Sequence, residues 1–103
     1  MAIFELKIAE SIDAGFSVTE ESEIIPQGVK CTIYLYESSC PDVPLAYSLL
    51  KFGDEILRVH QRNDEGKKIE IKGNGTDRVS INCYNECNNT YYFNAYLKAG
   101  YNG

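Results

Sequence analysis

The sequence predicts an all-β protein: a small antiparallel β-sandwich or barrel of about eight short strands. Apolar and polar residues alternate with a period of two through most of the chain, which is the pattern of half-buried strands. Clusters of Asn, Asp and Gly, which tolerate tight turns, separate the alternating runs. The chain has 103 residues and a hydrophobic content of 44%. These values suit a single domain over residues 1–103 with one modest core.

The alternating runs mark the expected strands in order along the chain. They fall near residues 2–9, 15–19, 22–25, 29–37, 55–62, 67–72, 78–84 and 90–98. The last four are joined by short loops, so we expect them to pair as an antiparallel meander, with the first half supplying the facing sheet. In the final strands we expect the odd-numbered apolar residues to face the core.

Residues 43–52 are compatible with two structures. Asp42 would cap a short helix, Pro44 would occupy its first turn, and Gly53 would end it. Leu45, Leu49 and Phe52 would then share one helical face. The same segment also alternates as a strand does, so the pattern leaves a short helix and a strand open.

Four cysteines in a short chain indicate disulfides and an oxidising compartment. They are Cys31, Cys40, Cys83 and Cys87. An extended strand after Cys31 carries the chain too far for a bridge to Cys40, because bridged Cα atoms lie within about 7 Å. The leading pairs are therefore Cys83–Cys87 and Cys40–Cys87, with Cys31 in the core. Four reduced thiols are the alternative, and the spacing does not fit a structural zinc site.

The charge and hydropathy of the chain exclude several partners. With 15 acidic and 10 basic residues, the formal net charge is −5, whereas nucleic-acid binders carry a basic excess to neutralise phosphates. No apolar run approaches the ~20 residues of a membrane helix, and the N-terminus lacks the pattern of a signal peptide. We expect no nucleic-acid partner and no membrane insertion. The cysteines favour an extracellular or cell-surface location, and otherwise the cytoplasm.

No catalytic constellation is visible in the sequence. The only histidine, His60, is expected to point outward beside Arg58, on a strand whose Leu57 and Val59 face the core. The glycine-rich run 73–75 lies between strands and is a turn rather than a phosphate-binding loop. We therefore expect a protein that is not an enzyme and that uses no metal and no cofactor.

The outward face of the predicted strands is rich in Tyr, Asn and Arg. Tyrosine rings offer a large contact area at low entropic cost, and polar tips orient a ligand. Tyrosine is also a good strand former, so cross-strand pairing is the structural alternative. The candidate ligand-binding residues are Tyr34, Tyr36, Arg58, His60, Asn82, Tyr84, Tyr92, Asn94 and Tyr96.

These features support three functional hypotheses. The first is a non-enzymatic binding module that recognises a glycan or a protein surface through the tyrosine face. The second is a small acidic intracellular inhibitor or immunity-type protein that blocks a basic site through the acidic runs Glu20 to Glu23 and Asp64-Glu65. The third is a structural subunit of a filament or coat, in which the strand Ala2 to Ile8 pairs with the sheet edge of a neighbour.

Overall fold

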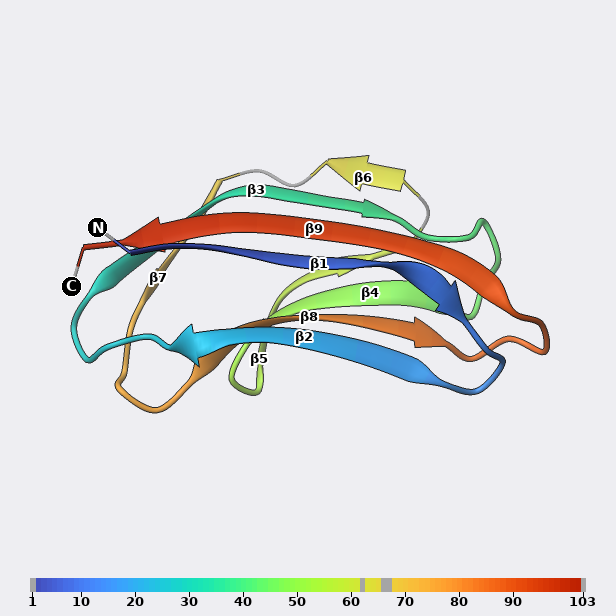
Figure 1. Cartoon of the computed structure of the whole chain (residues 1–103), viewed down its shortest axis with the longest axis horizontal. Coiled ribbons are helices and arrows are strands. Elements are labelled where there is room, and N and C mark those ends of the chain that lie inside the picture. The colour runs from blue at the N-terminus through green and yellow to red at the C-terminus, as the bar shows by residue number, and fades with distance from the viewer. Residues whose placement is uncertain (1, 62, 66–67, 103) are drawn as a thin grey trace.

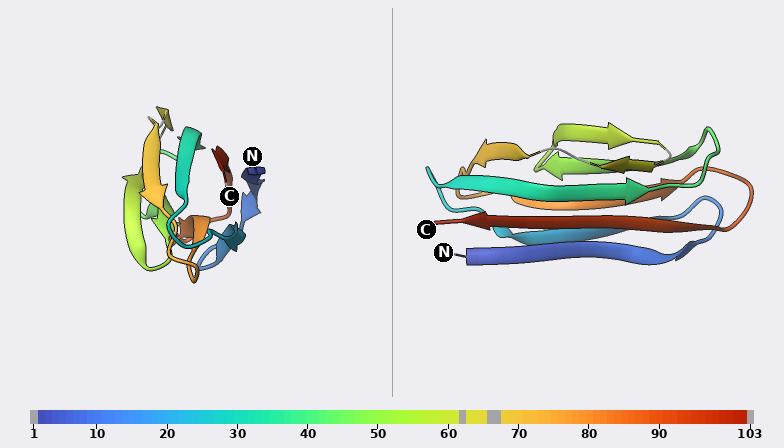
Figure 2. Two further views of the ribbon diagram at one scale, coloured as in Figure 1. Left: turned by 90° about the vertical axis from the view of Figure 1, so that its left-hand side faces the viewer. Right: turned by 90° about the horizontal axis from the view of Figure 1, so that it is seen from above.

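The protein is a two-layer antiparallel β-sandwich (Figures 1 and 2). The computed structural model describes residues 2–61, 63–65 and 68–102, with only the backbone described for 63–65. The described residues form nine strands and no helix, which confirms the predicted fold class. Residue 62, the last of the predicted strand 55–62, and residue 67, the first of the predicted strand 67–72, lie outside the described residues, as does residue 66. The molecule measures 43 × 23 × 19 Å because its longest strands run the length of the sandwich.

The strands divide between two sheets. They are β1 (Ala2–Ile12), β2 (Ser17–Ile24), β3 (Lys30–Ser39), β4 (Ala46–Phe52), β5 (Glu55–His60), β6 (Asn63–Glu65), β7 (Ile69–Lys72), β8 (Arg78–Asn85) and β9 (Tyr91–Tyr101). Sheet A has the order β1-β9-β3, with β6 and β7 both paired along the far side of β3. Sheet B has the order β2-β8-β4-β5.

The predicted meander from residue 55 onward is wrong. Strands β8 and β9 are consecutive, yet β8 pairs with β2 and β4 in sheet B while β9 pairs with β1 and β3 in sheet A. Only β4 and β5 form a hairpin between consecutive described strands, turning at Gly53 with a positive φ of 58°. Hydrophobic alternation identifies a strand, but it carries no information about the partner of that strand, because pairing is a long-range contact.

The segment proposed as either helix or strand is a strand. In β4, Ala46, Ser48, Leu50 and Phe52 are buried while the residues between them are half-buried. The strand lies inside sheet B between β8 and β5. Leu45, which would have joined the apolar face of a helix, is 52% exposed. The helical alternative is therefore wrong, since period-two burial against sheet A decides the conformation.

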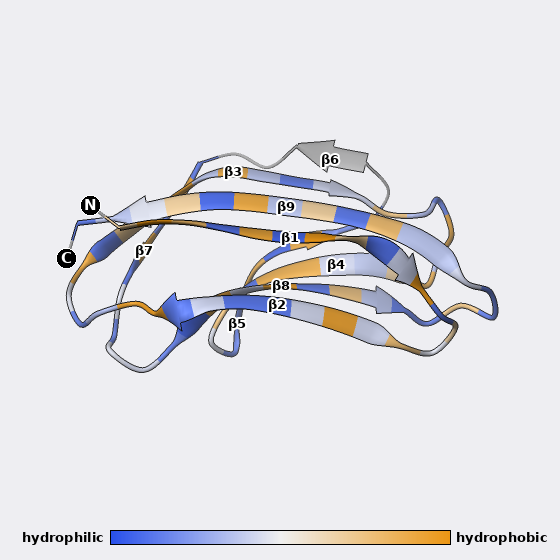
Figure 3. Cartoon of the chain, in the orientation of Figure 1, coloured by the Kyte–Doolittle hydropathy of each residue, from blue (hydrophilic) through white to orange (hydrophobic). Residues whose placement is uncertain are grey.

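The core lies between the sheets and is filled from alternate positions of the central strands. Phe93, Ala95 and Leu97 of β9 are fully buried, as are Val79 and Ile81 of β8. The alternation is visible along β9 in Figure 3. The prediction that odd-numbered apolar residues face inward in these last strands is confirmed.

All four cysteines are free thiols, so the predicted disulfides are wrong. Cys83 points into the core from the middle of β8, which stays extended to Asn85. Cys87 lies beyond the end of that strand, where its backbone N–H donates to Asn85 Oδ1 at 3.0 Å. The extended strand holds the two sulfurs apart. Cys40 is buried, and Cys31 belongs to the core as expected.

Two β-bulges reverse the direction of predicted site residues. In β3, Ile33 pairs with Ala99 and Leu35 with Lys98, so Tyr34 is an extra residue and the alternation shifts by one after it. In β5, Leu50 pairs with Arg58 and Lys51 with Ile56, which leaves Leu57 as the extra residue. The bulges turn the following side chains to the other face of the sheet.

Candidate functional site

The predicted ligand-binding residues do not form one face. Four lie on the outer side of sheet A, namely Tyr34, Tyr92, Asn94 and Tyr96. Asn82 and Tyr84 lie on the outer side of sheet B. Tyr36, Arg58 and His60 are turned toward the interior by the two bulges. Among these, Tyr36 is 0% and His60 3% exposed, while Val59 beside His60 is 57% exposed. The predicted orientations of Tyr36, Arg58, His60 and Val59 are therefore wrong.

The residues on sheet B are engaged within the protein. Asn82 is 6% exposed, accepts a hydrogen bond from Thr19 Oγ1 at 2.7 Å and donates to Ser80 Oγ at 3.1 Å. Tyr84 stacks on Tyr47 with ring centroids 5.1 Å apart, so one of its two ring faces is covered. This pair acts as a cross-strand contact of sheet B.

Tyr36 belongs to a buried polar cluster that joins the two sheets. Its hydroxyl lies 2.8 Å from Ser48 Oγ, and Ser38 Oγ lies 2.8 Å from the same atom. Ser38 also contacts the sulfur of Cys40 at 3.3 Å. Since Tyr36 and Ser38 come from β3 of sheet A and Ser48 from β4 of sheet B, these bonds cross the sandwich.

His60 and the three buried thiols are poorly suited to catalysis. Arg58 Nε donates to His60 Nε2 at 2.8 Å, so this ring nitrogen accepts a hydrogen bond within the protein. Burial raises the pKa of Cys83 to about 12 and that of Cys31 to about 11. Burial also raises the pKa of Cys40. At neutral pH these thiols are protonated, whereas a nucleophilic cysteine needs the thiolate.

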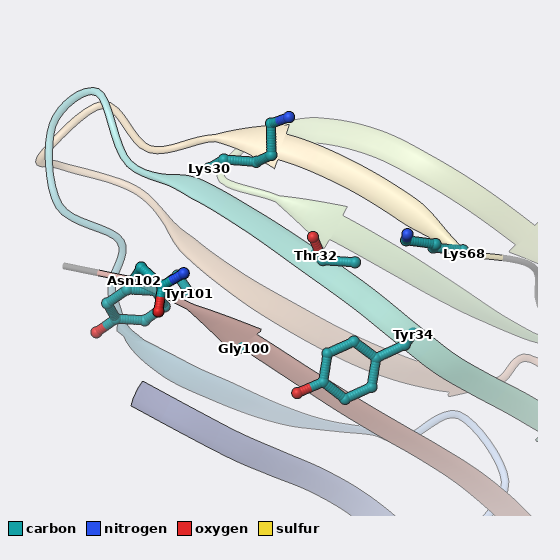
Figure 4. Close-up of a pocket in the computed structure, with 7 residues that line it drawn as sticks. All are labelled: Lys30, Thr32, Tyr34, Lys68, Gly100, Tyr101 and Asn102. Carbon is teal, nitrogen blue, oxygen red and sulfur yellow. The ribbon is translucent and has the colours of Figure 1, made fainter. Parts of the chain in front are cut away.

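A depression on the outer side of sheet A is the candidate binding site (Figure 4). Its volume is about 490 Å³. It is formed near the start of β3 and the end of β9, where β7 completes the sheet. The lining residues are Lys30, Thr32, Tyr34, Lys68, Gly100, Tyr101 and Asn102.

The shape of the depression depends on Tyr34 and Gly100. The bulge places Tyr34 opposite no residue of β9, and its ring reaches across that strand, as the close-up in Figure 4 shows. A Cβ atom on Gly100 would lie 2.7 Å from Tyr34 Oη, closer than van der Waals contact allows. Glycine at position 100 therefore makes room for the tyrosine ring, which remains 41% exposed.

Two lysines line the depression although the whole chain is acidic. Lys30 and Lys68 line it, and Lys72 lies on the same face of the sheet, opposite Lys30. Lys30 Nζ is 3.8 Å from Glu70 Oε2, with both side chains well exposed. Such a surface pair contributes little, so it leaves Lys30 able to contact a ligand.

Sequence reasoning identified Tyr34 but missed its neighbours. Lys30 and Thr32 share the outward side of β3 with it, and this alternation was readable from the sequence. Lys68 and Gly100 were not recognisable, because their places depend on β7 and β9 both pairing with β3.

No family model, curated protein or solved structure matches this chain. Function has to be inferred from the residues that line the depression and from their chemistry. Among the described residues, no group of three or more His, Cys, Asp or Glu side chains is placed to hold a metal ion. In the same part of the chain, no helix has the length and apolarity needed to cross a bilayer.

Proposed function

We propose that the protein is a non-enzymatic binding module that holds a glycan in the depression beside Tyr34. The observation that carries the proposal is an exposed tyrosine ring at the side of a concave surface lined with polar groups. The C–H face of a sugar ring packs against an aromatic ring, and a few convergent polar groups fix its orientation. Thr32 and Asn102 supply a hydroxyl and an amide for the sugar hydroxyls.

The two lysines favour a glycan that carries an anionic group. Lys30 and Lys68 place two ammonium groups on one side of the depression. Lysine acts as a point charge for carboxylates, sulfates and phosphates. A uronic acid or a sulfated sugar would satisfy these cations while its ring packs on Tyr34. Three of the acidic residues, Glu20, Glu21 and Glu23, lie on β2 in the other sheet. Glu70 lies opposite Thr32, beside the depression, and an anionic ligand would replace its weak, exposed contact with Lys30.

The test compares two exposed tyrosines of the same face. Tyr34→Ala should weaken binding of an acidic oligosaccharide by about tenfold or more, because a central aromatic contact dominates small interfaces. Tyr92→Ala is the matched control: Tyr92 is 60% exposed and lies eight residues from Gly100 along β9, roughly 27 Å away. Isothermal titration against uronic-acid, sulfated and neutral oligosaccharides gives the affinities. The proposal fails if none of these binds, or if Tyr92→Ala has the larger effect.

The charge of the ligand is tested separately. Lys30→Gln with Lys68→Gln should weaken binding of acidic oligosaccharides, reduce its dependence on salt and leave neutral oligosaccharides unaffected. Equal loss for neutral and acidic sugars would contradict the role given to the lysines. That result would not affect the role of Tyr34, which the comparison of Tyr34→Ala with Tyr92→Ala tests separately.

A second candidate function rests on the acidic edge of sheet B. Glu20, Glu21 and Glu23 are all exposed on β2, which would suit an inhibitor or immunity-type protein that covers a basic site. The side chains of Asp64 and Glu65, also assigned to this function, lie outside the described part of the chain. Glutamine at the three β2 positions should lower affinity for a basic polypeptide under this alternative and leave glycan binding unchanged under the first.

A further inference from the structure

Strand β1 is a long and regular sheet edge. Its eleven residues pair with β9 in consecutive order, from Ala2 opposite Tyr101 to Ile12 opposite Tyr91, without a register shift. It pairs with no other strand in the described part of the chain. Seen from above, it runs along the outer side of β9 (Figure 2, right). Half of the backbone N–H and C=O groups of such a strand point away from the sheet, ready to pair with another strand.

The other edges are protected in ways that β1 is not. The ladder of β2 shifts register between Glu21 and Ile24, and that of β4 with β5 shifts after Leu50. Strands β6 and β7, beside β3, have three and four residues. Short strands and bulges are common devices against edge-to-edge pairing. Strand β1 has neither a bulge nor a proline.

The charges of β1 make one antiparallel register self-complementary. In an antiparallel pair, side chains directly opposite each other lie on the same side of the sheet, and sides alternate along each strand. An even-numbered residue of one copy can therefore lie only opposite an even-numbered residue of the other, and an odd one opposite an odd one. The two-fold axis then passes through a residue position and not between two residues. An axis at Leu6 places Glu5 opposite Lys7 of the partner subunit, twice by symmetry. An axis at Glu5 would instead place two glutamates together, and an axis at Lys7 two lysines. Of these three registers, only the one centred on Leu6 places opposite charges across from each other.

The Leu6 register also matches the apolar residues. On the outer side, Ile3, which is 59% exposed, would lie opposite Ala9 of the partner subunit. On the inner side, Phe4 would lie opposite Ile8 of the partner subunit. Phe4 is half-buried in the single chain, so pairing would remove more of it from water.

We propose that two copies of this chain associate through β1, antiparallel and centred on Leu6, to form one continuous sheet. The two-fold closes the assembly, since each copy uses its one regular edge. Each copy carries a formal net charge of −5, so the two copies repel each other, which keeps the dimer weak. If the proposed glycan function holds, the dimer presents two Tyr34 depressions on one face, roughly 30 Å apart.

Charge reversal tests the register directly. Sedimentation velocity of the unmodified protein from about 10 μM to about 1 mM should show a monomer converting to a dimer and to nothing larger. Glu5→Lys alone places two lysines opposite each other at each of the two cross-strand contacts, and Lys7→Glu alone places two glutamates there. Each variant should weaken the dimer by about tenfold or more, because two attractive cross-strand pairs become repulsive.

Mixing the two variants separates association from folding. In a mixed dimer of Glu5→Lys with Lys7→Glu, every charge at positions 5 and 7 again faces its opposite, so the mixture should recover the dimer. Within each chain, Glu5 lies opposite Lys98 in the ladder and shares a side-chain hydrogen bond with Tyr96. Any cost of losing these contacts is unchanged by mixing. Glu55→Lys, the same charge change on exposed β5, is the matched control and should leave the dimer intact. Circular dichroism and thermal unfolding confirm that each variant is folded.

Three results would overturn the proposal. They are a monomer throughout the concentration range, a dimer that neither charge reversal weakens, and folded single variants whose mixture stays monomeric. None of them bears on glycan binding, which is measured on dilute protein.

Discussion

Individual residues of this protein are constrained most tightly where backbone passes close to other groups. Gly73 and Gly100 illustrate two degrees of this constraint. A Cβ on Gly73 would overlap the backbone carbonyl oxygen of Pro26 and come within 2.7 Å of Ile25 Cγ2. A Cβ on Gly100 meets the hydroxyl of Tyr34, the far end of a side chain that can move, and would lie 3.2 Å from the backbone carbonyl oxygen of Ala2. The two glycines therefore differ in what an added methyl group displaces.

We expect Gly73→Ala to destabilise the protein by about 3 kcal/mol, because backbone at the turn after Ile25 has to shift. Gly100→Ala should cost less, about 1 kcal/mol, since Tyr34 can swing aside and β1 has to shift only slightly at Ala2, but it should weaken glycan binding as Tyr34→Ala does. Urea unfolding and isothermal titration measure the two effects. Equal stability of the two variants would show that the close approach at Gly73 is unimportant.

At the scale of elements, the two bulges decide which side chains are inside. The bulge at Tyr34 turns Tyr36 into the core, and the bulge at Leu57 does the same for His60. The two rings then lie 4.9 Å apart between the sheets. Residues that alternate as an exposed polar face in the sequence thus become part of the contact between β3 of sheet A and strands β4 and β5 of sheet B.

The hydroxyl of Tyr36 should contribute measurably to stability. Tyr36→Phe removes the hydrogen bond to Ser48 across the sandwich and should cost about 1 kcal/mol. Ser48→Ala removes a partner from both Tyr36 and Ser38, and should cost about 2 kcal/mol. In urea unfolding, the double variant should lose less than the sum of the single variants, because they share one bond. A fully additive double variant would mean that the two hydroxyls act independently.

The whole molecule buries several weak acids in their neutral form. Burial raises the pKa of Cys31 to about 11 and those of Tyr36 and Cys83 to about 12, against ordinary values of 9.0 for Cys and 10.0 for Tyr. The folded state therefore keeps protons that the unfolded state releases. The stability that these groups contribute is complete below their ordinary pKa values and is lost as the pH rises through the folded ones.

We expect the urea midpoint to lose this contribution progressively from about pH 9 to about pH 12. Cys83→Ser, which replaces the thiol by a group that does not titrate in this range, should make the fall shallower. For each protein, the urea midpoint at high pH is compared with the midpoint of the same protein at neutral pH. A midpoint that stays constant up to about pH 11 would contradict the burial of these acids.

The sequence alone was sufficient for the fold class and for the inward-facing residues of the last strands. Alternation in β8 and β9 is a local property that follows from the pleat of a strand, so Phe93 and Val79 could be assigned without a partner. Tyr34 could also be identified as an outward tyrosine. The local pattern correctly marked where most strands lie along the chain.

The tertiary structure alone decided the pairing of strands, the bulges and the composition of the site. Lys68 lines the same depression as Tyr34 because β7 pairs with β3. Gly100 lies beside Tyr34 because β9 pairs with the other side of β3. A bulge is set by the register between strands that are distant in sequence, so no local pattern revealed that Tyr36 and His60 turn inward. The thiols are unpaired for the same reason, since the extended course of β8 holds Cys83 away from Cys87. Long-range pairing, rather than local preference, therefore determines the surface that this protein presents.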